Sequence, residues 1–230
     1  MKKVVHIIPV GHTKVTLIEG MKQYPFHKLI LILGKQKSSG EAKARKIADE
    51  IKKEFTGIAI VKYHYVDIDD IYQTAIEIAK VVVEEQKEQN EVKINASGSL
   101  RTIGISCYLA SSLTGAELYV SLPSYEDGNV AGIKKVVEIP AFPVKEIGSE
   151  ELKILKFLHK KGPVESLDSL IEGINLGNIS KNTHLKERAR MSYHIKKLKK
   201  DGFIKTHRLG KNLKIEISRL GELYNISRFT

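Results

Sequence analysis

Residues 1–122 alternate between short apolar runs and longer segments in which apolar residues recur every three or four positions. The runs are almost continuous in Val, Ile and Leu, which is typical of parallel strands that helices cover on both faces. We predict strands near residues 3–9, 28–33, 58–66, 92–96 and 117–122, with helices between them. Right-handed crossovers between such strands give the α/β class and a Rossmann-like, doubly wound, mainly parallel sheet.

Turn and cap residues mark the ends of several predicted elements. Asp127, Gly128 and Asn129 form a turn before a further strand over residues 133–139, which we expect to run antiparallel at the sheet edge. Ser38 and Glu41 have the spacing of a capping box at the start of the second helix. We interpret these residues as features of the scaffold.

Two loops join a strand of this sheet to the start of a helix. The first and fourth strands of a doubly wound sheet are neighbours or flank the reversal of strand order, and ligands bind beyond their carboxyl ends. Free N–H groups at a helix start attract anions, and hydroxyl, lysine and arginine side chains add donors and charge. We therefore predict an anion site with two sets of residues: Pro9, Val10, Gly11, His12, Thr13 and Lys14, and Asn95, Ala96, Ser97, Gly98, Ser99, Leu100, Arg101 and Thr102.

Several other kinds of site find little support in the sequence. The motif GxGxxG does not follow the first strand, and GxxxxGK[ST] is absent, so neither a dinucleotide coenzyme nor a P-loop nucleotide is indicated. His184, His194 and His207 lack a cysteine or carboxylate at metal-ligand spacing. We assign no metal, no required cofactor and no catalytic residue. A plain helix cap is the alternative interpretation of the second loop.

The pattern changes after Pro140 and Pro143, and we place a domain boundary between residues 147 and 148. Residues 148–230 predict three helices, the third from about His184 to Asp201, followed by a hairpin with a basic turn. This order is typical of a winged helix-turn-helix, whose third helix enters the major groove of DNA. The predicted DNA contacts are Lys186, Arg188, Arg190, Ser192, Tyr193, Lys196, Lys197, Arg208, Lys211 and Asn212.

Charge is divided unevenly between the two parts. Residues 149–230 hold 18 Lys and Arg against 9 Asp and Glu, whereas residues 1–148 hold 20 against 18. A basic excess on helices and a hairpin is the electrostatic footprint of a module that binds phosphates, although a lysine-rich face is often only solvated. The order of elements and the basic turn favour double-stranded DNA as the partner.

The apolar runs are too short to cross a bilayer, and the first residues lack the cleavage site of a signal peptide. We therefore expect a cytoplasmic protein with no membrane partner. The single cysteine, Cys107, lies in an apolar run and is expected to be a buried, inert thiol.

The segment Asn95-Ala96-Ser97-Gly98-Ser99-Leu100-Arg101 is similar to the Asn-x-Thr-Gly-Gly-Thr-Lys/Arg segment of CRISPR-associated Rossmann fold (CARF) domains. Gly98 and the basic Arg101 match, Ser97 stands for Thr, and Ser99 and Leu100 depart from the pattern. With its predicted winged helix, the whole chain resembles archaeal CARF transcriptional regulators. The resemblance implies a ligand-sensing and dimerisation domain over residues 1–147, a symmetric homodimer, and cyclic tetra-adenylate bound between the loops across the two-fold axis.

The resemblance thus implies a DNA-binding regulator, acting on CRISPR-Cas genes in antiviral defence, that senses cyclic oligoadenylate. Two alternatives stay open. Some CARF domains are ring nucleases that cleave their cyclic oligoadenylate, and this reaction needs little beyond positioning of the ribose 2′-hydroxyl. The departures at Ser99 and Leu100 also allow a regulator that senses a different nucleotide or metabolite.

Overall fold

The computed structural model describes residues 2–36, 38–98, 101–141, 146–174, 181–210 and 212–229, although the side chains of 181–184, 209 and 229 are not described. The chain divides into two units, Met1–Val144 and Lys145–Phe229. The division lies near the boundary predicted between residues 147 and 148.

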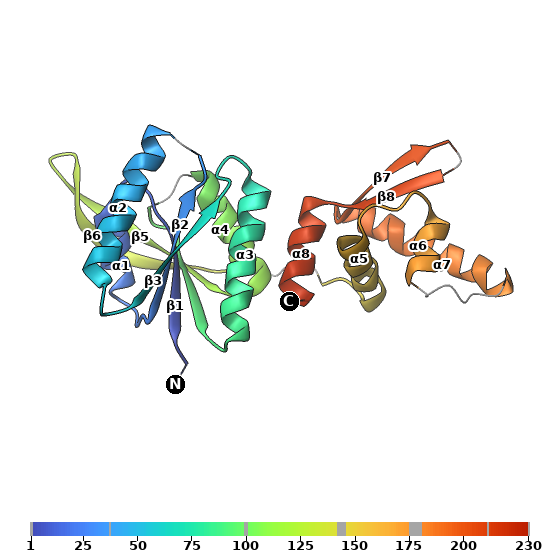
Figure 1. The fold of residues 1–230 in the computed structure, drawn as a ribbon, viewed down its shortest axis with the longest axis horizontal. Coiled ribbons are helices and arrows are strands. Elements are labelled where there is room, and N and C mark those ends of the chain that lie inside the picture. Colours follow the sequence, from blue (N-terminus) through green and yellow to red (C-terminus); the bar gives the residue numbers. More distant parts are fainter. Residues whose placement is uncertain are drawn as a thin grey trace. The chain divides into compact units, whose positions relative to one another are not determined.

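A six-stranded sheet forms the centre of the front unit (Figure 1). Its strands in chain order are β1 (Val4–Pro9), β2 (Lys28–Gly34), β3 (Ile60–Val66), β4 (Glu91–Asn95), β5 (Glu117–Glu126) and β6 (Asn129–Ile139). In space the order is β3-β2-β1-β4-β5-β6, in which only β6 runs antiparallel to its neighbour. The predicted Rossmann-like, mainly parallel sheet is therefore confirmed, and the order reverses between β1 and β4.

Helices cover both faces of this sheet, with α1 and α2 on one face and α3 and α4 on the other (Figure 1). Their bounds are α1 (Lys14–Met21), α2 (Ser39–Phe55), α3 (Ile71–Lys87) and α4 (Arg101–Thr114). Every residue of β1 is buried, as the apolar run predicted for a central strand. Cys107 on α4 is fully buried, and burial raises the pKa of its thiol to about 12.

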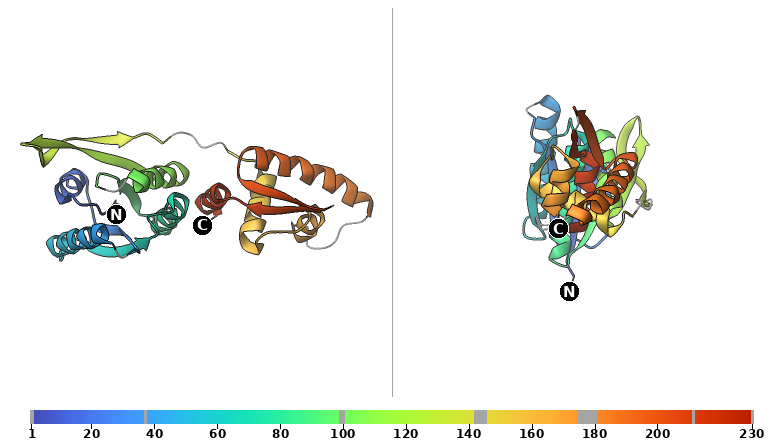
Figure 2. Two further views of the ribbon diagram at one scale, coloured as in Figure 1. Left: turned by 90° about the horizontal axis from the view of Figure 1, so that it is seen from above. Right: turned by 90° about the vertical axis from the view of Figure 1, so that its right-hand side faces the viewer.

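Strands β5 and β6 form a long antiparallel ribbon at one edge of the sheet (Figure 2, left). The turn that joins them has positive φ angles at Asp127 (49°) and Gly128 (79°), as tight hairpin turns require. The predicted antiparallel edge strand is thus confirmed. It begins at Asn129, earlier than residue 133, because the ribbon continues to the turn.

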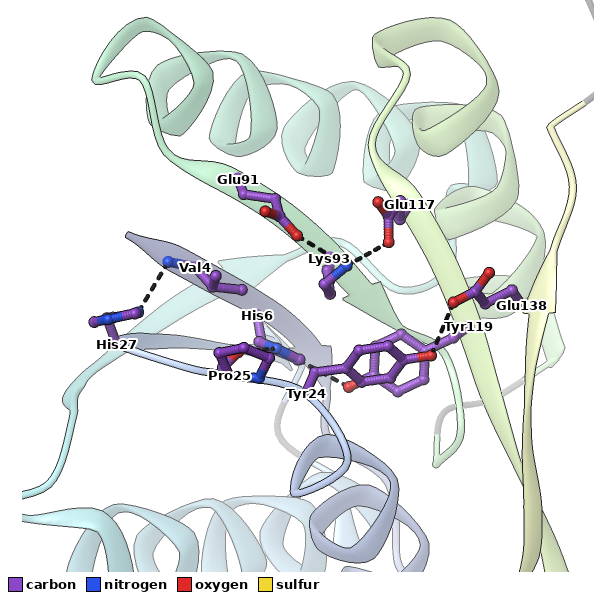
Figure 3. A network of polar contacts seen from close by, with 10 residues as sticks. All are labelled: Val4, His6, Tyr24, Pro25, His27, Glu91, Lys93, Glu117, Tyr119 and Glu138. Atoms are coloured by element: carbon purple, nitrogen blue, oxygen red, sulfur yellow. Dashed lines mark hydrogen bonds and ion pairs between the residues drawn. The ribbon is translucent and has the colours of Figure 1, made fainter. Parts of the chain in front are cut away.

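A buried polar network lies on the α1 face of the sheet (Figure 3). The His6 ring contacts the Tyr119 hydroxyl at 2.8 Å through Nδ1 and the Pro25 carbonyl oxygen at 3.2 Å through Nε2. Because a carbonyl only accepts, Nε2 carries the hydrogen and Nδ1 accepts from Tyr119. Burial lowers the pKa of His6 to about 4, so the imidazole is neutral at pH 7.

The back unit consists of helices and one hairpin, in the order of a winged helix (Figure 1). Its elements are α5 (Ser149–Lys161), α6 (Leu167–Ile174), α7 (Lys181–Lys200), β7 (Ile204–Leu209), β8 (Asn212–Ile217) and α8 (Arg219–Phe229). The predicted inward residues Met191, Ile195 and Leu198 of α7 are buried. Gly202, with φ of 80°, follows α7 and ends it as predicted.

Candidate functional site

The reversal of strand order places the two predicted loops side by side. β1 and β4 pair directly in parallel, so the loops that follow Pro9 and Asn95 leave the same edge of the sheet. The first loop leads into α1 and the second into α4. The expected adjacency of the first and fourth strands is therefore correct, and a ligand crevice is expected at this edge.

A cavity of about 440 Å³ lies at this edge. Its volume falls within the range of about 300–1,000 Å³ that is typical of small-molecule sites. Both predicted loops contribute to its lining, together with the first turns of α2 and a residue after β3. The lining residues are Val10, Gly11, His12, Thr13, Ser38, Gly40, Glu41, Ala44, Ile68, Gly98 and Ile103.

Asn95 and Ser97 shape the second loop from inside. Asn95 is fully buried; its Nδ2 donates to the Leu17 carbonyl oxygen at 3.0 Å, and its Oδ1 accepts from the backbone N–H of Ser97 at 3.1 Å. The Ser97 hydroxyl also contacts Asn95 Oδ1 and accepts from the backbone N–H of Ser121 on β5 at 2.8 Å. These two predicted ligand residues therefore hold the loop against α1 and β5.

The two predicted cations differ in their surroundings. The Lys14 ammonium lies 2.9 Å from Glu54 and 3.7 Å from Glu50, so α2 balances its charge. Arg101 is exposed at the start of α4 and makes no ion pair with the described part of the chain. Arg101 is therefore the cation of this pair that is open to an anionic ligand.

The start of α1 leaves backbone donors open. Thr13 occupies the N-cap position, yet its side chain makes no capping hydrogen bond. His12 is held beside it, because its Nε2 lies 3.0 Å from the carbonyl oxygen of Gly40 and must donate to it. N–H groups at an uncapped helix start are suited to an anion.

The remaining predicted ligand residues are placed as follows. Pro9 is buried at the end of β1, the Ala96 N–H donates to the Tyr119 carbonyl oxygen, and Thr102 is exposed on α4. Ser99 and Leu100 lie outside the described residues.

In the back unit, ion pairs hold three of the predicted DNA contacts within the domain. Arg188 donates twice to Asp168 of α6, at 2.5 and 2.6 Å. Arg190 binds Glu150 of α5 at 2.9 Å and Glu187 at 2.7 Å, and Lys197 binds Glu151 of α5 at 2.6 Å. These basic groups fix α7 to its neighbours as well as adding positive charge.

The other predicted contacts point to solvent. Lys186, Tyr193 and Lys196 of α7 are exposed, Tyr193 to 64%, and Ser192 between them is half-buried. Arg208 and Asn212, at the end of the hairpin, are exposed as well. Lys211 lies outside the described residues. The outer face of α7 and the hairpin therefore present basic and polar groups without ion pairs to the described residues.

Comparison with known proteins establishes the family. Residues 4–126 match the family described as HFX_2341_N:-like, N-terminal. The chain belongs to this family. Residues 150–227 match the DUF6293 C-terminal winged helix domain, so the back unit is a winged helix domain and the predicted architecture is confirmed. An "uncharacterized protein" of Archaeoglobus fulgidus is 28% identical over 227 residues, covering 97% of this chain and 98% of the relative.

Solved structures give weaker likenesses. Enterococcus italicus Csm6 bound to cyclic hexa-2′-fluoro-hexa-dAMP has a TM-score of 0.48 at 9% identity; the match covers 88% of this chain but 57% of Csm6. Can2 from Sulfobacillus thermosulfidooxidans in complex with cyclic tetra-adenylate has a TM-score of 0.41 at 11% identity, covering 93% of this chain and 72% of Can2. Scores this low assign no function. The fold of the HFX_2341-like domain follows from its own strand order.

Sequence reasoning missed two parts of these sites. The first turns of α2 and Ile68 line the cavity of the HFX_2341-like domain because β2 lies beside β1 and β3 lies beside β2, and no motif marks that proximity. In the winged helix domain, α8 was not predicted, although Ser218 accepts from the backbone N–H of Gly221 at 3.0 Å and begins that helix as a cap.

Among the described residues, no helix is long and apolar enough to cross a membrane.

Proposed function

We propose that this chain is a ligand-responsive transcriptional regulator. Its winged helix domain binds double-stranded DNA, and its HFX_2341-like domain binds an anionic nucleotide that alters the affinity for DNA. One observation carries the proposal: Lys186 and Lys196 lie exposed on the outer face of α7, on either side of Tyr193, without ion pairs to the described residues. Such a face on the third helix is suited to the major groove, where lysines contact phosphates and bases.

As the ligand we propose a cyclic oligoadenylate, specifically cyclic tetra-adenylate, which the resemblance of residues 95–101 to CARF domains implies. The cavity between the two loops favours a nucleotide as the ligand. The uncapped start of α1 at Thr13 and the exposed Arg101 offer hydrogen-bond donors and positive charge to its phosphates. Lys14 has no direct role in this proposal, because Glu50 and Glu54 hold its ammonium. Regulation of CRISPR-Cas genes in antiviral defence follows from the same resemblance.

We further propose a symmetric homodimer in which each copy contributes one set of loops to a single cyclic ligand. Two-fold symmetry duplicates every donor, so two copies of Arg101 and of the helix starts serve four phosphates. A dimer also presents two winged helices to paired half-sites on DNA. Ligand binding then changes the DNA affinity by favouring one relative placement of the two winged helices.

The ligand proposal is tested by incubating the protein with labelled cyclic tetra-adenylate and resolving bound and free products. Recovery of intact cyclic ligand in a stable complex is the expected result. Release of linear product assigns the ring nuclease activity instead, and contradicts a purely regulatory role. Absence of binding contradicts this ligand and favours a regulator of a different nucleotide or metabolite.

A further inference from the structure

The cavity at the edge of β1 and β4 has a lining unlike that of a phosphate site. Val10, Ala44, Ile68 and Ile103 give it apolar walls, and its described lining residues include no Lys or Arg. Glu41, an acidic residue, also lines it, as it lines a neighbouring cavity with Arg45 and Asp49. Because like charges repel more strongly at low dielectric, a phosphate is disfavoured in this space. The cavity is suited to an uncharged, flat part of a ligand.

Glu41 is held firmly at the start of α2. Glu41 is 8% exposed, and its Oε2 accepts a hydrogen bond from the backbone N–H of Gly34 at 2.8 Å. A Cβ at Gly34 would lie 2.6 Å from the Glu41 carboxyl carbon, so the glycine allows this approach. The predicted capping box is therefore only half formed: the Glu41 N–H donates to Ser38 Oγ at 3.2 Å, whereas the carboxylate turns to Gly34.

The second oxygen of the Glu41 carboxylate remains available. Oε1 makes no hydrogen bond, and Glu41 makes no ion pair, with the part of the chain that the structure describes. Because the Gly34 N–H binds Oε2, Oε1 is the oxygen that can accept a hydrogen bond from a ligand. The lining thus combines apolar side chains with Glu41, whose carboxylate has one oxygen bound to Gly34 and one without a hydrogen bond to the described residues.

We infer that this cavity holds a nucleobase of the ligand and that Glu41 Oε1 accepts a hydrogen bond from the exocyclic amino group of that base. The inference rests on the proposed function and deepens it by naming a specificity-determining residue. Apolar walls favour the flat faces of a base, and a carboxylate acceptor matches an amino group such as that of adenine. The phosphates then lie away from Glu41, near Arg101 and the backbone N–H groups at the start of α1.

Two cyclic tetranucleotides test this inference: cyclic tetra-adenylate, and the same ring with purine, which lacks the amino group, in place of adenine. Calorimetric titration of the wild-type protein should show about 10- to 100-fold tighter binding of the adenine compound. In Glu41→Gln, the Gly34 N–H keeps the amide oxygen in place, so the amide NH₂ faces the base. This variant should lose most or all of the preference, mainly through weaker binding of the adenine compound.

Glu84→Gln is the matched control, because Glu84 is an exposed acid on α3 that does not line the cavity. It should keep the wild-type preference. Equal binding of the two compounds by the wild-type protein, or an unchanged preference in Glu41→Gln, overturns the role of Glu41 and leaves the proposed function standing. Binding of neither compound overturns the proposed ligand as well. Even if Glu41→Gln fails to fold, equal binding of the two compounds by the wild-type protein overturns the inference.

Discussion

The ammonium group of Lys197 lies 2.6 Å from Oε1 of Glu151, a carboxylate whose side chain is only 3% exposed. His194 Nδ1 lies 3.1 Å from the same oxygen. Both basic residues belong to α7, whereas Glu151 lies in the first turn of α5. This buried acid therefore fixes the proposed recognition helix to the first helix of the winged helix domain.

Replacing Glu151 with Gln should destabilise the winged helix domain by about 1–3 kcal/mol at pH 7, since a buried charged acceptor is lost. Burial raises the pKa of Glu151, but hydrogen bonds from Lys197 and the backbone, together with the nearby His194 ring, outweigh this effect and lower the pKa to about 2. The carboxylate thus contributes stability above pH 4.5 that is lost as the pH falls towards 2. Urea unfolding at pH 7 and pH 3 measures both effects. If Glu151→Gln loses as much stability between pH 7 and pH 3 as the wild-type protein does, this role of Glu151 is refuted.

Removing the exposed lysines of α7 should weaken DNA binding without loss of stability. In the double variant Lys186→Ala with Lys196→Ala, the slope of log affinity for duplex DNA against log salt should become shallower by up to about 2, or about 0.9 per phosphate contact. Lys160→Ala with Lys161→Ala removes the same charge from exposed positions on α5 and should leave most of the slope intact. Equal losses in both variants would mean that general charge, and not the α7 face, binds DNA.

The sequence was sufficient to predict the strands of the sheet, because nearly continuous apolar runs such as Val4–Pro9 leave few alternatives to a buried parallel strand. It was also sufficient to predict that the loops after β1 and β4 lie close together, since the topology alone brings the ends of these two strands to the same edge. It did not reveal that Arg188 and Lys197 bind Asp168 and Glu151. Such pairs depend on which helices pack together, and periodicity carries no information on that.

Gly98 should be intolerant of a side chain. A Cβ at this position would lie 2.7 Å from Cδ2 of Leu17, which is fully buried. Gly98→Ala is therefore expected to displace the loop after β4, lower the thermal midpoint and weaken cyclic tetra-adenylate binding. Gly104→Ala on α4 meets nothing within 4 Å and should be neutral or stabilising by up to about 1 kcal/mol. Similar binding of cyclic tetra-adenylate by Gly98→Ala and Gly104→Ala would contradict the tight contact between Gly98 and Leu17.

His6 should make the HFX_2341-like domain sensitive to mild acid. Its folded-state pKa is lowered by burial from 6.5 to about 4, so the unfolded chain takes up the proton first as the pH falls. The stability that depends on neutral His6 is complete above pH 6.5 and decreases by roughly 3 kcal/mol on approaching pH 4. Chemical unfolding from pH 7 to pH 4 should show a smaller decrease in His6→Asn. An identical pH dependence of the two proteins would argue against a neutral buried His6.

The central claim, that a ligand of the HFX_2341-like domain controls the winged helix domain, is tested most directly by one linked pair of titrations. The chain with both domains is titrated with a DNA duplex that it binds, at fixed salt, with and without saturating cyclic tetra-adenylate. We predict a change in DNA affinity of about 5-fold or more, and the same factor for ligand affinity with and without DNA. DNA affinity that stays the same while the ligand is bound would contradict the account.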